Sequence, residues 1–138
     1  MGTMVLMRLT GFILVLACAG CGHSPTGPSA IDSGLWGGDH VTLMVGEGKA
    51  HFEFDCAHGD IPAALTADHG EIAASGTFVR EHGGPIRVDE VQDAHPAVYS
   101  GSVSGARMQL SIRLTDSADV VGPFVLTRGA SGRVVKCL

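Results

Sequence analysis

Histidines are the residues of this chain best suited to chemistry near neutral pH, because imidazole binds metals and exchanges protons there. His40, His58, His82 and His95 fall in segments that we expect to be loops or strand ends. If His40, His58 and His82 meet at one rim, they could hold Zn²⁺, which accepts neutral imidazoles in a tetrahedral site. The sequence lacks the His-x-His and His-Glu-x-x-His spacings. A zinc site is therefore the weaker interpretation, and no other cofactor is indicated.

Cys56 and His58 are separated by one residue, a spacing at which an imidazole base could activate a thiol nucleophile. The competing interpretation is a disulfide, because Cys137 is the only other cysteine after residue 21. The first twenty residues also predict export to an oxidising compartment, where disulfides form. We therefore predict a Cys56–Cys137 disulfide, which would tie the end of the chain to its second strand.

Hydrolase chemistry is weakly indicated. The segment Gly101–Gly105 has the two outer glycines of a nucleophile elbow, but Val103 stands where the serine belongs. Glu81 and Glu90 are a carboxylate pair of the kind that glycosidases use, although the sequence leaves their separation in space open. The sequence thus favours a non-enzymatic role without excluding an enzyme.

The polar loops are better interpreted as a rim that binds a partner. Residues 81–85 read Glu-His-Gly-Gly-Pro, which predicts a shaped, exposed loop beside a charged and a titratable side chain. Trp36, the only tryptophan, could either stack on a ligand or fill one end of the domain. The candidate rim residues are His40, His58, Glu81, His82, His95 and Trp36.

The first twenty residues predict a helical signal peptide. One basic residue, Arg8, precedes an apolar run from Leu9 to Ala17, which small residues follow. At about nine residues the run is too short for a membrane-spanning helix of about 20.

This leader resembles those of bacterial lipoproteins, in which a cysteine after the apolar run is lipidated and becomes the mature N-terminus. Cys21 follows Ala19-Gly20, the closer match to that pattern, and Cys18 is the alternative. Cleavage before Cys21 also leaves one lipid carrier and one disulfide pair. The resemblance implies export across the inner membrane. Because Gly22 rather than aspartate follows Cys21, it further implies anchoring at the outer membrane, facing the periplasm.

Residues 21–33 are rich in Ser, Pro and Gly and predict a flexible tether. Removing residues 1–20 leaves eight basic and fourteen acidic residues, a formal net charge of −6. That balance excludes nucleic acid as an expected partner, since such binding depends on clustered Lys and Arg. The expected partners are the membrane, through the lipid anchor, and an envelope protein or a small ligand.

The elements that must position these residues are strands, because residues 34–138 show no helical period and Gly recurs every few residues. Seven or eight short strands joined by hairpin-length loops predict an all-β antiparallel meander that closes as a small barrel, with a two-sheet sandwich as the alternative. The predicted strands are 41–45, 52–56, 72–80, 86–88, 98–103, 106–114, 122–128 and 133–137, with a weaker edge segment at 61–65.

The clearest pattern lies in residues 106–114. Met108, Leu110, Ile112 and Leu114 alternate with polar residues, so all four should point inward. The preceding Ser104-Gly105 predicts a tight hairpin turn.

Residues 34–138 are also similar to a family of small secreted or lipid-anchored bacterial domains. The matching pieces are Gly34–His40, Phe54–Gly59, Glu81–Pro85, Tyr99–Gly101 and Lys136–Leu138. The resemblance brings no activity with it, and a likeness to periplasmic barrels such as lysozyme inhibitors and lipocalin-like proteins concerns architecture only. We therefore expect a lipid-anchored envelope protein that acts as a binding or interaction module. A histidine-dependent metal-binding protein or enzyme, and a structural envelope component, are the alternatives.

Overall fold

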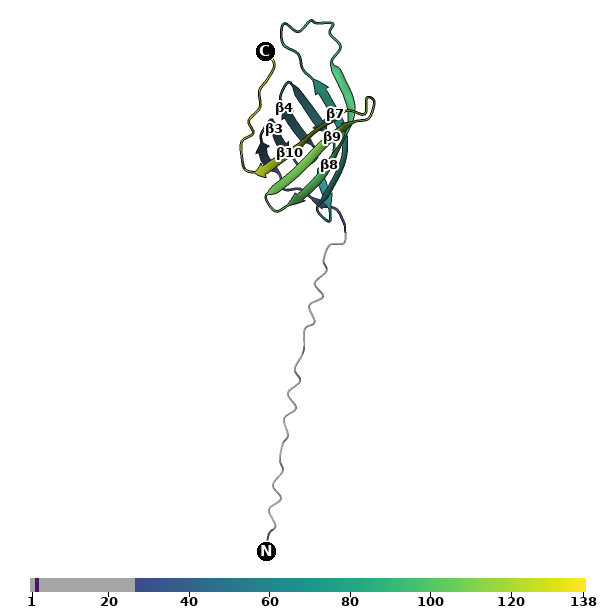
Figure 1. Ribbon diagram of the computed structural model, residues 1–138. Coiled ribbons are helices and arrows are strands. Elements are labelled where there is room, and N and C mark those ends of the chain that lie inside the picture. The colour runs from purple at the N-terminus through teal and green to yellow at the C-terminus, as the bar shows by residue number, and fades with distance from the viewer. Residues whose placement is uncertain (1, 3–26) are drawn as a thin grey trace.

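The structure is a computed structural model that describes residue 2 and residues 27–138, and its fold is a closed eight-stranded antiparallel β-barrel (Figure 1). The all-β barrel prediction is confirmed, and the sandwich alternative is wrong. The predicted signal peptide and both candidate lipidation sites, Cys21 and Cys18, lie outside the described residues. Across residues 27–138, no helix is long and apolar enough to cross a membrane.

Eight strands follow one another around the barrel in the order β7-β5-β4-β3-β2-β10-β9-β8, and β8 pairs with β7 to close the ring. Their bounds are β2 Gly34–Gly38, β3 Val41–Val45, β4 Ala50–Phe54, β5 Ala57–Ile61, β7 Glu71–Arg80, β8 Asp93–Ser104, β9 Arg107–Leu114 and β10 Val120–Arg128. Two short strands, β1 (Ser29–Ala30) and β6 (Thr66–Asp68), extend the sheet beside the start of β7. The predicted hairpins β3–β4 and β8–β9 are confirmed.

Period-two burial explains why these residues form strands. In β9, Met108, Leu110, Ile112 and Leu114 are all fully buried while the residues between them face outward, as predicted. In β4 the same alternation buries Ala50, Phe52 and Phe54 in the core. Each strand therefore contributes one apolar face to a common interior.

The interior of the barrel is filled by aromatic and aliphatic side chains. The Tyr99 ring lies 4.7 Å from the Phe52 ring, and the Tyr99 hydroxyl donates a hydrogen bond to the Thr77 carbonyl (2.6 Å). Burial raises the pKa of the Tyr99 hydroxyl above its ordinary value. A Cβ at Gly59 would lie 1.9 Å from the Tyr99 hydroxyl, so the absence of a side chain there makes room for the ring.

Two predicted strands are absent from the fold. Residues 86–88 belong to a loop of residues 81–92, because β7 and β8 already pair with each other along their lengths and leave no partner for a further strand. Residues 133–137 belong instead to a C-terminal tail (residues 131–138), whose strand-type pairing within the described residues is limited to an isolated bridge between Asp39 and Arg133. The weak edge segment expected at 61–65 is not a strand beyond Ile61. The strand in this region is β5, which lies earlier, at Ala57–Ile61.

The predicted tether ends earlier than residue 33. Ser29 and Ala30 pair with β6, and Ile31, 8% exposed, belongs to the hydrophobic core. Its amide donates to the Leu65 carbonyl (2.9 Å). Within the described residues, strand pairing therefore begins at residue 29, because the apolar side chain of Ile31 docks this otherwise polar segment on the barrel.

The barrel has two distinct ends. The strand register aligns Gly38, Val41, Phe54, Ala57 and Arg80 at one end. We call this the distal end; its loops are 39–40, 55–56, 81–92 and 115–119. The described chain enters at the opposite end, where β1 lies, and the C-terminus lies beside the 81–92 loop (Figure 1). The ten residues of β7 that separate the two ends span roughly 30 Å at about 3.3 Å per residue.

Candidate functional site

The distal end gathers most of the residues that the sequence singled out. His40 lies in the β2–β3 turn, His58 near the start of β5, His82 in the 81–92 loop and His95 near the start of β8. Trp36 does not join them: it is 1% exposed in the core and donates from Nε1 to the Asp32 carbonyl (3.4 Å).

The 81–92 loop is the most apolar exposed segment of the distal end. Ile86, Val88 and Val91 are each at least 84% exposed. Single exposed apolar residues are ordinary, but three on one loop are the kind of feature that marks an interaction site. Gly84 adopts a positive φ of 98°, a conformation that favours glycine.

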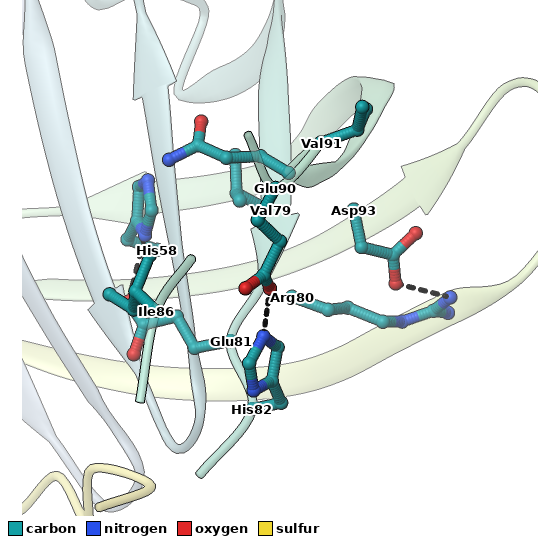
Figure 2. A pocket seen from close by; sticks show the side chains of 10 residues that line it. His58, Val79, Arg80, Glu81, His82, Ile86, Glu90, Val91 and Asp93 are labelled. Atoms are coloured by element: carbon teal, nitrogen blue, oxygen red, sulfur yellow. Dashed lines mark hydrogen bonds and ion pairs between the residues drawn. The ribbon is translucent and has the colours of Figure 1, made fainter. Parts of the chain in front are cut away.

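A pocket of about 150 Å³ lies at the base of this loop (Figure 2). Val79, Ile86 and Val91 supply its apolar lining. Strands β5, β7 and β8 and the loop itself all contribute to it. The full lining is His58, Val79, Arg80, Glu81, His82, Ile86, Glu90, Val91, Gln92 and Asp93.

His82 and Glu90 join the two ends of the loop, as Figure 2 shows. His82 Nδ1 donates to the Gly83 carbonyl (3.0 Å) while Nε2 contacts Glu90 Oε1, and the Arg87 amide donates to Glu90 Oε2 (3.2 Å). The Gly83 carbonyl and then the Glu90 carboxylate favour the protonated ring and raise the pKa of His82. The contact with His82 lowers the pKa of Glu90.

A chain of hydrogen bonds and ion pairs runs from the pocket across the outer face of β5 and β4. His58 Nδ1 lies 2.8 Å from Glu81 Oε1, and Lys136 Nζ lies 2.9 Å from the same oxygen. Lys136 also contacts Glu53 Oε2 (2.5 Å), and Glu53 Oε1 lies 2.9 Å from His51 Nε2. Partial burial alone would raise the pKa of Glu81, but the hydrogen bonds from Lys136 and His58 outweigh it and lower that pKa. The Glu81 carboxylate and the Lys136 ammonium group are therefore both charged around neutral pH.

The C-terminal tail fastens three distal loops to one another. The His40 amide donates to the Arg133 carbonyl (2.8 Å), and the Cys56 amide donates to the Val135 carbonyl (3.1 Å). Cys56 and Cys137 form the predicted disulfide. Cys56 is therefore not a free thiol, and the nucleophile interpretation of the Cys56–His58 spacing is wrong.

The candidate metal ligands are not brought together. His58 and His82 both line the pocket, whereas His40 does not and instead lies 2.5 Å from Asp55 through its Nδ1. Within residues 27–138, no group of three or more His, Cys, Asp or Glu side chains has a metal-binding arrangement. Each of the six histidines of the domain has a carboxylate neighbour instead.

Glu81 and Glu90, the carboxylate pair considered for glycoside chemistry, both line the pocket. Such chemistry needs one carboxyl group with a raised pKa to act as general acid. The structure lowers the pKa of both groups, through Lys136 for Glu81 and through His82 for Glu90. Neither carboxyl group therefore has the raised pKa that is typical of a general acid.

Sequence reasoning found His58, Glu81 and His82 but missed the apolar part of the pocket, above all Ile86 and Val91. The available signal was the run from Ile86 to Val91, in which β-branched residues alternate with charged ones after Gly-Gly-Pro. Its first part, residues 86–88, is predicted as a strand, but within residues 27–138 no strand pairs with it. Val79, Arg80 and Asp93 gave no separate signal because they lie at the ends of ordinary strands, and Gln92 is an ordinary polar residue of the loop beside them.

No protein-family model matches the chain, and neither the curated proteins nor the solved structures contain a match to it. Function is therefore inferred from the chemistry of the distal end.

Proposed function

We propose that this chain is a lipid-anchored binding module of the bacterial cell envelope that holds a partner protein at its distal end. The observation that carries the proposal is an apolar-lined pocket beneath a loop with three exposed apolar side chains, Ile86, Val88 and Val91. Exposed apolar side chains beside a pocket, ringed by charged residues, are the usual anatomy of a protein interface.

The size of the pocket favours a protein side chain over a small molecule. Sites for drug-sized ligands occupy roughly 300–1,000 Å³, whereas this pocket holds about 150 Å³. That volume suits one inserted side chain of the kind that anchors protein interfaces. The metal-binding and structural alternatives have no comparable supporting feature.

The direction of the barrel supports an anchored role. A lipid on Cys21, or on the alternative Cys18, would lie on the side where the described chain enters, and the 81–92 loop lies at the opposite end. The pocket would then face away from the outer membrane, towards partners in the periplasm.

Several contacts also restrain the distal end, which lowers the entropic cost of binding. The Cys56–Cys137 disulfide, the Lys136 ion pairs and the contact between His82 and Glu90 all restrain it. A partner would therefore meet a preformed surface.

Site-specific photo-crosslinking tests the proposal. A photoreactive amino acid replaces Val88 in the full chain expressed in its native cells, and a second strain carries it at Met44, an exposed residue of β3 near the opposite end of the barrel. We expect one discrete protein adduct from position 88, its loss on adding Ile86→Asp, and no such adduct from position 44. Equal adducts from both positions, or none from position 88, would reject the distal end as the contact surface.

A further inference from the structure

We propose that the distal pocket accepts one apolar side chain, of leucine or phenylalanine size, from a partner segment that carries Lys or Arg beside it. This inference rests on the proposed function and specifies the chemistry of the partner. Two independent features support it: the volume and lining of the pocket, and the charges around its mouth.

The volume sets the size of the inserted group. A dry cavity of about 150 Å³ lined by Leu, Ile and Phe is large enough to bind benzene. The pocket has about the same volume, and Val79, Ile86 and Val91 provide its apolar contacts. An alanine side chain would leave most of it empty.

The charges around the mouth set the flanking residues. From Glu81 to Asp93 the loop carries four carboxylates, at Glu81, Asp89, Glu90 and Asp93, and a single arginine, Arg87. Two further cations lie nearby, and each is shared between two carboxylates: Lys136 between Glu81 (2.9 Å) and Glu53 (2.5 Å), and Arg80 between Asp119 (2.8 Å) and Asp93 (3.9 Å). Six carboxylates therefore face three Lys and Arg side chains, and His82 contacts one of the six, Glu90. The mouth is therefore net acidic and attracts a cationic segment.

The same charge argues against two other occupants. A second copy of this chain would bring an equally acidic loop, so like charges would oppose pairing of the two distal ends. An anionic lipid surface would repel the carboxylates at Asp89 and Glu90, which lie between the apolar side chains Val88 and Val91. A cationic protein segment is the occupant that meets both the apolar and the acidic features.

Three disulfide-closed synthetic peptides test the inference on the purified full chain. The first presents a central Leu flanked by Lys, the second a central Leu flanked by Glu, and the third a central Ser flanked by Lys. Binding is followed by NMR shifts of the Ile86, Val79 and Val91 methyl groups. We expect the first peptide to bind roughly tenfold or more tightly than either other peptide, with affinity falling as salt rises.

Matched variants separate the two features. Ile86→Ser should abolish the preference for Leu over Ser, whereas Val120→Ser should leave it unchanged. Glu90→Gln should reduce the preference for Lys flanks, whereas Glu47→Gln, in the turn between β3 and β4, should not. Thermal unfolding of each variant verifies that it is folded.

Contrary results are distinguishable from failure of the proposed function. If the Glu-flanked peptide binds at these methyl groups as tightly as the Lys-flanked one, or more tightly, the inference of a cationic partner is overturned. The crosslink at position 88 then still tests the proposed binding role by itself. Absence of methyl shifts with all three peptides overturns the inference outright. Sedimentation with phosphatidylglycerol vesicles that Ile86→Ser abolishes would show a membrane contact instead and would also overturn it.

Discussion

Lys136 Nζ lies 2.9 Å from Glu81 Oε1, so one ion pair links the C-terminal tail to the start of the 81–92 loop across 55 residues of sequence. The same ammonium group contacts Glu53 on β4. The tail therefore supports the wall of the distal pocket although no residue of the tail lines it.

Replacing Lys136 with Met should lower the free energy of unfolding by about 1 kcal/mol, since partly exposed ion pairs contribute little individually. Glu53 and Glu81 lose their cation, so their pKa values should rise. Chemical denaturation at pH 7 and NMR titration of the carboxyl groups measure the two effects. Lys49→Met, at the exposed lysine of the β3–β4 turn, is the matched control. Equal effects of both substitutions would contradict a special role for Lys136.

The same carboxylates predict how stability depends on acid. The folded-state pKa values of Glu53 and Glu81 are lowered, so their contribution is complete above their unfolded pKa, near 4.5. It is lost as pH falls through the folded values, below about 4.5. Urea denaturation between pH 3 and pH 6 should show this decline, and Glu81→Gln should make it shallower. An unchanged slope in that variant would refute the assignment.

The 81–92 loop should become more mobile as pH rises. The folded-state pKa of His82 is raised, so the stabilisation from its contact with Glu90 is complete below the unfolded value near 6.5. It is lost as pH rises through the folded value, above 6.5. Backbone NMR relaxation of the loop at pH 6 and pH 8 should detect the change. His82→Gln should remove the pH dependence, and His69→Gln, at an exposed histidine in the turn between β6 and β7, should preserve it.

Cleaving the Cys56–Cys137 disulfide should destabilise the domain by roughly 2–4 kcal/mol. The bond closes a loop with a sequence separation of 81, for which chain entropy gives an upper value of about 4–5 kcal/mol. Thermal unfolding of the Cys56→Ser, Cys137→Ser double variant measures the loss, and reductant should change the native chain but not the variant. An unchanged midpoint in both experiments would show that the disulfide does not stabilise the fold.

Gly59→Ala should destabilise the barrel by about 1–3 kcal/mol through overpacking. The new Cβ would meet the Tyr99 hydroxyl at 1.9 Å and the Thr77 carbonyl at 2.8 Å. Gly48→Ala is the control, because a Cβ there has no neighbour within 4 Å. Denaturation midpoints of the two variants should therefore differ clearly, and equal midpoints would refute the close packing around Tyr99.

Patterns that depend on near neighbours were readable from the sequence. The inward face of β9, from Met108 to Leu114, follows from period-two alternation, and the hairpin at Gly105 follows from the need for a positive φ. The same reasoning failed for residues 86–88, because alternation describes a strand only if a partner is available. It also failed at Ile31, where a single apolar residue docks a segment of otherwise polar composition.

The sequence by itself determined the all-β class, the buried faces of the main strands and the pairing of Cys56 with Cys137, because each rests on alternation or on the small number of cysteines. Only the tertiary structure decided that His58, Glu81, His82 and the apolar loop share one pocket, and that the tail braces it. The physical reason is that strand order and register set which loops meet at an end of the barrel. Strand order and register depend in turn on closure between β7 and β8 and on contacts between residues far apart in the chain.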